Sequence, residues 1–182
     1  MTLAEVLAEI VRALDAAEVP HMVAGSLAST HHGEPRSTQD IDLVIDPSEA
    51  ALANFVSALD RDRFYVGDAQ GALERRDQFN VIDLTTGWKV HLIICKDRPF
   101  SRSEFARRQP VVIAGVATAV ATAEDTILAK LEWARAGGSD RQRRDVASML
   151  TVQRDALDTD YLYRWADELG ISDDLNAALR EM

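Results

Sequence analysis

Cysteine is nearly absent from this chain, and long apolar runs are missing. The 182 residues contain one cysteine, Cys95, in the run VHLIIC, so no disulfide framework is possible within the chain. We therefore expect Cys95 to be a core residue and the protein to be cytoplasmic. No apolar run approaches the roughly 20 residues of a membrane-spanning helix, so we expect no membrane association. The acidic N-terminal segment, with Glu5 and Glu9, does not resemble a signal peptide.

Positive charge is also scarce, because 20 Lys and Arg face 30 Asp and Glu, for a formal net charge of −10. This excess of acid disfavours non-specific binding to nucleic acid. The imbalance is uneven: residues 61–144 hold 15 of the basic residues and 11 of the acidic ones. This net positive stretch is either a surface for a polyanion such as RNA or a set of solvated helix faces.

The pattern of apolar residues divides the chain into two parts. Up to residue 120 strand patterns and helix patterns alternate, which predicts an α/β (α+β) core over residues 1–120. From residue 121 to residue 182 only helical periodicity is found, and each helix begins near a Ser, Thr or Asp. We therefore expect a C-terminal helical region over 121–182.

Two aspartates begin the apolar strand pattern DIDLVID. Side chains two residues apart on a strand lie on the same face, so Asp40 and Asp42 are expected side by side. Two neighbouring carboxylates repel each other unless a cation lies between them, and Mg²⁺ is commonly held by one or two carboxylates together with substrate phosphates. The motif therefore predicts metal ligands at Asp40 and Asp42; the alternative is a solvated strand end with unrelated acids.

A Gly-Ser step precedes the aspartates, where a predicted strand gives way to a predicted short helix. Gly25 permits the turn, and the backbone N–H groups at a helix N-terminus bind phosphate. The hydroxyl of Ser26 is placed to donate to the same group. Gly25 and Ser26 thus predict a phosphate-binding turn close to the predicted metal site.

The segment GSLASTHHGEPRSTQDIDLVID resembles the signature of the nucleotidyltransferase superfamily, which has the DNA polymerase β-like fold. The resemblance covers about residues 20–150 and includes the helical motifs of minimal bacterial members related to AbiE-type toxins. It implies a mixed sheet flanked by helices, a Mg²⁺ or Mn²⁺ cofactor, and transfer of a nucleotide from an NTP to a hydroxyl group. The AbiE relationship further implies a possible toxin role.

The same resemblance assigns roles to residues in the helical part. It implies that Lys130 contacts the triphosphate, that Asp145 orients this lysine or acts as a base, and that Arg141 or Arg144 lies near the nucleotide. Without the resemblance, Lys130 is equally a helix residue that extends its amine to solvent, and Asp145 an i,i+4 partner of Arg141.

The third acid of the superfamily is missing, since the expected KVDLF-like strand is KVHLI and His91 stands in place of the acid. Imidazole suits Zn²⁺ or Mn²⁺ better than Mg²⁺. A three-residue loop between the two strands is expected to place Asp83 across from His91, on the face of Asp40 and Asp42. Under this hypothesis Asp83 supplies the missing charge and His91 is a ligand or base; the alternative is a structural Asp–His pair.

Two further residues approach the acidic strand. Arg36 is expected either to contact a phosphate or to neutralise the acids, and Thr38 is expected at the nucleotide. The sequence leaves two functions open: an active nucleotidyltransferase with an RNA, tRNA, protein or small-molecule acceptor, and a catalytically impaired module that binds a nucleotide or a protein partner such as an antitoxin.

Overall fold

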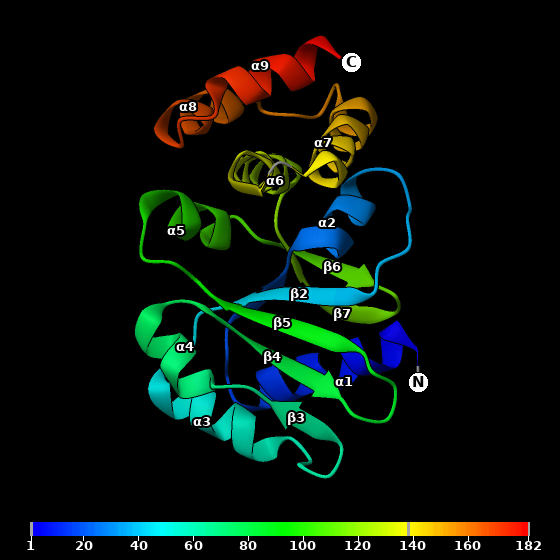
Figure 1. Ribbon diagram of the computed structural model, residues 1–182, viewed down its shortest axis with the longest axis vertical. Helices are drawn as coiled ribbons and strands as arrows, with labels where there is room; N and C mark the ends of the chain where they lie inside the picture. The colour runs from blue at the N-terminus through cyan, green and yellow to red at the C-terminus, as the bar shows by residue number, and fades with distance from the viewer. Residues whose placement is uncertain (1, 138, 182) are drawn as a thin grey trace.

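A seven-stranded mixed sheet forms the centre of the computed structural model, which describes residues 2–137 and 139–181. The strand order is β3-β4-β5-β2-β1-β7-β6. β2 is parallel to β5 and β1 is parallel to β7, whereas the other neighbouring pairs are antiparallel. The strands are β1 (His21–Val23), β2 (Asp40–Ile45), β3 (Phe64–Val66), β4 (Gln78–Asp83), β5 (Lys89–Ile94), β6 (Gln109–Ile113) and β7 (Val116–Val120). The expected mixed sheet flanked by helices is confirmed (Figure 1).

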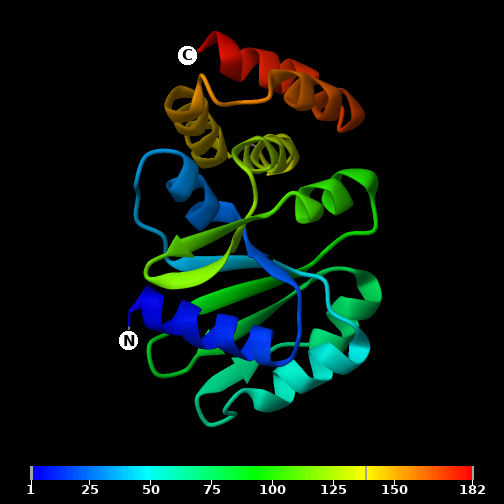
Figure 2. The ribbon, with the colours of Figure 1, turned by 180° about the vertical axis from the view of Figure 1, so that it is seen from behind.

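One face of the sheet carries the main hydrophobic core. In β2, Ile41, Leu43 and Ile45 are fully buried, while the intervening residues are only partly buried. β4 and β5 show the same alternation because successive strand residues point to opposite faces. Three helices cover this face: α1 (Leu3–Ala16), α3 (Glu49–Ala58) and α4 (Ala69–Arg75) (Figures 1 and 2).

Local sequence determines where these helices begin. α1 starts at a capping box in which the Thr2 hydroxyl accepts from the Glu5 amide and the Glu5 carboxylate accepts from the Thr2 amide. Ser48 and Asp68 cap α3 and α4 in the same way, each accepting from an amide three residues later. The buried residues of α1 recur at helical spacing, as the sequence predicted.

The other face of the sheet carries the second group of helices (Figure 1). They are α2 (Gly25–His32), α5 (Pro99–Ala106), α6 (Ala123–Gly137), α7 (Asp140–Gln153), α8 (Thr159–Glu168) and α9 (Ser172–Arg180). The last four helices build a separate hydrophobic cluster around Leu128, Met149 and Leu162. The predicted helical C-terminal region is therefore present, while its treatment as a domain that begins at residue 121 stays a prediction.

The β4–β5 hairpin differs from the expected register. Ile82 pairs with Lys89 and Asn80 pairs with His91, so four residues, 84–87, form the loop in place of three. The Gly87 amide donates to the carbonyl of Asp83 at 2.7 Å, which closes this longer turn. The hypothesis that Asp83 lies across from His91 is therefore wrong, and Asn80 occupies that position.

No helix in the described part of the chain has the length and apolar character needed to cross a bilayer.

Candidate active site

The two aspartates of β2 lie on the sheet face opposite the main core. Their partly exposed side chains alternate with the buried Ile41 and Leu43, as the strand period predicted. In the neighbouring parallel strand β5, His91 pairs with Asp42 and shares its face. His91 Nε2 lies 3.9 Å from Asp40 Oδ1. The structure thus brings Asp40, Asp42 and His91 together.

The Gly-Ser turn lies against the same carboxylates. Gly25 has φ +55°, and a Cβ atom at this position would lie 2.0 Å from Asp42 Oδ2. Only glycine allows both this left-handed conformation and this close approach. The Ser26 amide, at the start of α2, donates to Asp42 Oδ2 at 3.4 Å. The N-terminus of α2 and the acidic strand therefore form one continuous site.

Lys130 and Asp145 also meet, from two different helices. Lys130 Nζ donates to Asp145 Oδ2 at 2.8 Å, and only 6% and 7% of their side-chain surfaces are exposed. Burial lowers the pKa of Lys130, although the carboxylate of Asp145 opposes this effect. Burial also disfavours the charged form of Asp145, but hydrogen bonds from Arg36 and Lys130 outweigh it and lower the pKa of Asp145.

Arg36 connects this ion pair to the Gly-Ser turn. Its Nε and Nη2 each lie 2.7 Å from an oxygen of Asp145, and Nη2 also donates to Ser26 Oγ at 2.8 Å. A bidentate guanidinium–carboxylate pair is a strong and directional contact. Arg36 thus neutralises Asp145 and not the aspartates of β2, and it occupies the hydroxyl that was predicted to bind phosphate.

Two polar residues of this network were not predicted. Ser29 Oγ donates to Asp145 Oδ2 at 3.4 Å, and Lys130 Nζ donates to Gln142 Oε1 at 2.8 Å. Ser29 lies one helical turn after Ser26, and Gln142 lies three residues before Asp145, so the helical period offered a signal for both.

Asp83 lies on the other face of the sheet, away from this site. Its side chain is 0% exposed. It accepts from the amides of Thr85 and Thr86 and from Arg63 Nη2. Burial raises the pKa of Asp83, but these donors outweigh it and lower the pKa overall. Asp83 is therefore a buried structural acid of the hairpin, and the hypothesis that it supplies the missing charge is wrong.

Asn80 takes the position that was expected for Asp83. It pairs with His91 on the face of the β2 aspartates. Its Oδ1 is buried and has no hydrogen-bond partner among the described residues. No acid therefore lies opposite His91.

Among the described residues, Thr38 and Arg144 make no hydrogen bond or ion pair with Arg36, Lys130 or Asp145. The Thr38 hydroxyl donates to the carbonyl of Asp40 at 3.0 Å, which shapes the entry into β2. Arg144 is exposed on α7, one residue before Asp145. Their expected roles at the nucleotide stay predictions.

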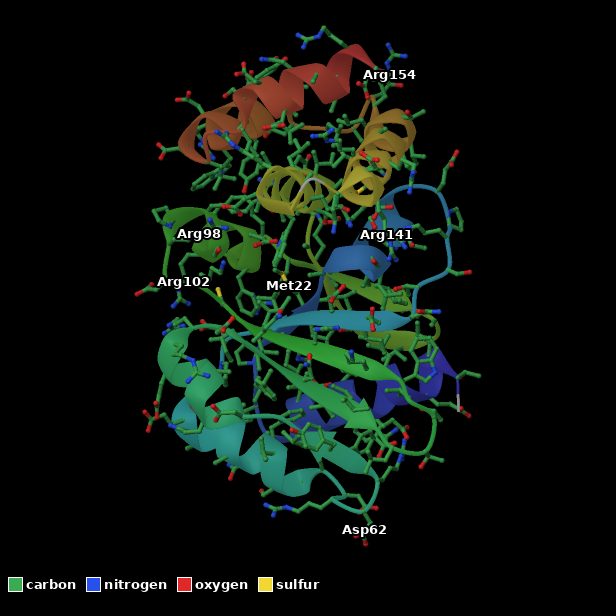
Figure 3. The ribbon with its side chains drawn as sticks, in the orientation of Figure 1. Met22, Asp62, Arg98, Arg102, Arg141 and Arg154 are labelled. Carbon is green, nitrogen blue, oxygen red and sulfur yellow. The ribbon has the colours of Figure 1, made fainter. Side chains whose placement is uncertain are left out.

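A cavity of about 360 Å³ joins most of these residues. Gly25, Ser26, Asp42, His91 and Lys130 line one part of it. The cavity continues beneath α5 and α6 to the end of β5. Figure 3 labels Arg98, which precedes α5 and lines the cavity, and Arg141 near the start of α7.

The carboxylates at this site suit a metal ion that is coordinated by the protein and a substrate together, and not one that is held by the protein alone. Within residues 2–137 and 139–181, no group of three or more His, Cys, Asp or Glu side chains is arranged to hold a metal. Asp40 and Asp42 nevertheless present hard carboxylate oxygens on one face, and Asp40 is half exposed. Mg²⁺ suits such a pair when substrate phosphates complete its coordination.

Comparison with known proteins identifies the fold of this chain but not its family. The chain matches no protein-family model and no curated protein. Its structure is similar to that of an antigenic nucleotidyltransferase-like protein from Paracoccidioides brasiliensis, with a TM-score of 0.60 and 18% identity over 98% of this chain and 92% of that one. It is also similar to the antibiotic-resistance factor ANT(2'')-Ia, with a TM-score of 0.60 and 14% identity over 98% and 94% of the two chains. The fold is therefore that of nucleotidyltransferase-like proteins.

A second structure of ANT(2'')-Ia, in complex with adenylyl-2''-tobramycin, gives a TM-score of 0.59 and 15% identity over 93% of this chain and 97% of that one. All three similarities extend over nearly the whole of both chains.

Proposed function

We propose that this protein is a metal-dependent nucleotidyltransferase that moves an NMP from an NTP to a hydroxyl group. The observation that carries the proposal is the contact between Asp42 and the Gly25–Ser26 turn, in the cavity that His91 and Lys130 also line. Nucleotidyl transfer needs a phosphate site, a carboxylate pair and a cation. The Gly25–Ser26 turn, Asp42 and Lys130 line this cavity, and Asp40 lies on the same strand face as Asp42. Similarity to ANT(2'')-Ia, whose complex holds an adenylylated product, supports the same reaction class.

In the proposed reaction the acceptor oxygen forms a bond to the α-phosphorus while the bond to the pyrophosphate oxygen breaks. The backbone amides at the start of α2 and the ammonium of Lys130 bind the triphosphate oxygens. Asp40 and Asp42 would hold the metal ion, which would neutralise negative charge at the phosphate. His91, beside Asp42, takes the proton of the acceptor hydroxyl, and pyrophosphate leaves.

Arg36 has two states in this proposal. In the structure it contacts the Ser26 hydroxyl and the carboxylate of Asp145. The triphosphate competes for the Ser26 hydroxyl, and Arg36 then donates to a phosphate oxygen with Nη2 while Nε stays on Asp145. Asp145 thus positions two cations at the phosphates.

A labelled-nucleotide assay tests the proposal. The protein is incubated with each α-labelled NTP, Mg²⁺ or Mn²⁺, and total tRNA or small hydroxyl compounds. We expect label transfer that Asp42→Ala abolishes and that Asp62→Ala, which removes an exposed acid at the far end of the molecule (Figure 3), leaves unchanged. Equal transfer by Asp42→Ala and the wild type would exclude the proposed site.

A second candidate is a non-catalytic module that binds a nucleotide or a protein partner. It is favoured by His91 in place of the third acid and by Asn80, not an acid, opposite it. NTP binding without transfer to any acceptor, under both metals, would support it. The finer proposals, namely an AbiE-like toxin of the cytoplasm with a tRNA acceptor or an antitoxin partner, rest on the sequence resemblance and on the Lys130–Asp145 pair.

A further inference from the structure

The cavity has a second compartment that the proposed reaction does not use. Beyond Asp42 and His91 it continues between the end of β5 and the helices α5 and α6. The residues that distinguish this compartment are polar or aromatic: Cys95, Arg98, Phe100, Glu104, Glu132 and Trp133. Its position beside the candidate active site means that a ligand bound here lies next to the reacting phosphate.

Glu104 is an acid of this compartment that lacks a paired cation. It lines the cavity from α5, and within residues 2–137 and 139–181 its carboxyl group makes no hydrogen bond or ion pair. Arg98, the cation that acts on Glu104, is already engaged by Glu132 through two bonds of 2.6 Å. Asp125, which also faces Glu104, is satisfied by Tyr161 and other donors. Lys96 also lines the cavity but is not among the groups that shift the pKa of Glu104, so no described cation that acts on Glu104 is left unpaired.

The surroundings of Glu104 disfavour its negative charge. Burial, together with the carboxylates of Asp125 and Glu132, raises its pKa from the ordinary 4.5 to about 8 against the opposing charge of Arg98. Glu104 in turn raises the pKa of the Cys95 thiol, which directly follows β5. A cation bound beside Glu104 would favour its carboxylate form, because it would offset the neighbouring acids that disfavour this charge.

Trp133 supplies an aromatic surface at the same compartment. It lines the cavity from α6, and 61% of its surface is exposed. An indole face attracts cations and covers the carbon skeleton of a ring. Phe100, which is buried, closes the inner wall. The compartment therefore combines an unpaired carboxyl group with an apolar platform. It shares the cavity of about 360 Å³ with the proposed triphosphate site, so the space that remains suits a small molecule and not a nucleic-acid strand.

We propose that this compartment binds the acceptor substrate and that it selects a small hydroxyl compound with a protonated amine, which Glu104 pairs with and Trp133 covers. This inference rests on the proposed function, because it names the acceptor class for the same cavity. Binding converts the neutral carboxyl group of Glu104 to a carboxylate, and the released proton goes to solvent. Ligand binding is therefore coupled to proton release.

The test uses the whole chain with ¹³C-labelled glutamate carboxyl groups and two matched probes, glucosamine and glucose, without NTP. At pH 6.5 the amine of glucosamine is charged, and the raised pKa of Glu104, about 8, favours its neutral form. We expect glucosamine to move the Glu104 carboxyl signal to the carboxylate position and glucose to leave it unchanged. Glu104→Gln assigns the signal and should weaken glucosamine binding at least tenfold, as Glu168→Gln, an exposed control on α8, should not.

Two outcomes would overturn the inference. One is equal binding of glucosamine by the wild type and Glu104→Gln. The other is displacement of glucosamine by ATP with a shift of the Glu104 signal, which would assign the compartment to the nucleoside. The amide signals of Gly25 and Ser26 under Mg²⁺–ATP report separately on the proposed triphosphate site, so failure of the acceptor inference is distinguishable from failure of the proposed function.

Discussion

Lys130 on α6 and Asp145 on α7 form an ion pair of 2.8 Å in which both side chains are more than nine-tenths buried. A buried charge is tolerated only when it is paired and hydrogen-bonded, and this pair is completed by Arg36, Ser29 and Gln142. The network fastens α6 and α7 to the loop before β2. The same contacts therefore stabilise the fold and hold two cations beside the phosphate-binding turn.

Asp145→Asn should destabilise the protein by about 3–5 kcal/mol, because it leaves Lys130 buried without a counter-charge. The free energy of unfolding, measured by urea denaturation at pH 7, provides the readout. Asp167→Asn, which changes an exposed acid on α8, should stay within about 0.5 kcal/mol of the wild type. Similar stabilities for the two variants would show that the Lys130–Asp145 pair contributes little.

Gly25→Ala should lower both stability and NTP affinity. The added Cβ would meet Asp42 Oδ2 at 2.0 Å, and φ +55° is unfavourable for alanine, so the turn has to move. We expect a loss of about 1–2 kcal/mol from the backbone strain, together with at least tenfold weaker nucleotide binding by calorimetry. Gly137→Ala is the matched control, because no atom lies within 4 Å of its added Cβ and it should bind NTP like the wild type.

Asp83→Asn should lower the stability of the protein without changing its rate of nucleotidyl transfer. It removes the carboxylate that Arg63 and two turn amides share on the core side of the sheet. We expect a loss of about 3 kcal/mol at pH 7. Because the pKa of Asp83 is lowered by folding, its contribution is present above its ordinary pKa of 3.8 and is lost as the pH falls through the folded value. The stabilities of variant and wild type should therefore converge in acid.

The chemical part of this prediction has its own measurement. Label transfer per folded molecule of Asp83→Asn, under Mg²⁺, should equal that of the wild type. A large loss of transfer in the folded fraction would mean that Asp83 acts at the site after all.

His91→Asp restores an acid beside Asp42 and separates the two candidate functions. If the protein is an active transferase that uses His91, the variant should keep activity and prefer Mg²⁺ over Mn²⁺ more strongly than the wild type, because a carboxylate is the harder ligand. If the wild type is an impaired module, the variant should gain transfer that the wild type lacks. The ratio of label transfer under the two metals is the measurement, with Asp62→Ala as the control.

Glu104→Gln should change how stability depends on pH. Folding raises the pKa of Glu104, so the native state binds the proton more tightly than the unfolded state does. The stability that this provides is fully present below about pH 4.5 and is lost as the pH rises through about 8. The variant lacks this loss. Urea denaturation should therefore show Glu104→Gln gaining on the wild type between pH 5 and pH 8.5; parallel curves over that range would contradict the raised pKa.

The sequence alone determined those features of the site that depend on local periods. Asp40 and Asp42 share a face because a strand alternates with a period of two, and Gly25 permits a turn that few other residues can adopt. The helix caps and the helical C-terminal region follow from equally local rules. Lys130 and Asp145 were expected near the nucleotide from the family resemblance, and the structure brings them into contact.

Only the tertiary structure decides which residues that are far apart in the sequence meet at the site. The β4–β5 loop has one residue more than expected, and this changes which β4 side chains share a face with His91. Asp83 therefore lies on the core face, and Asn80 lies opposite His91. Arg36 reaches Asp145 across 109 residues of chain, which no local period encodes. Glu104 carries no signal in the sequence, because its unpaired state and raised pKa arise only when α5 and α6 enclose it in the cavity.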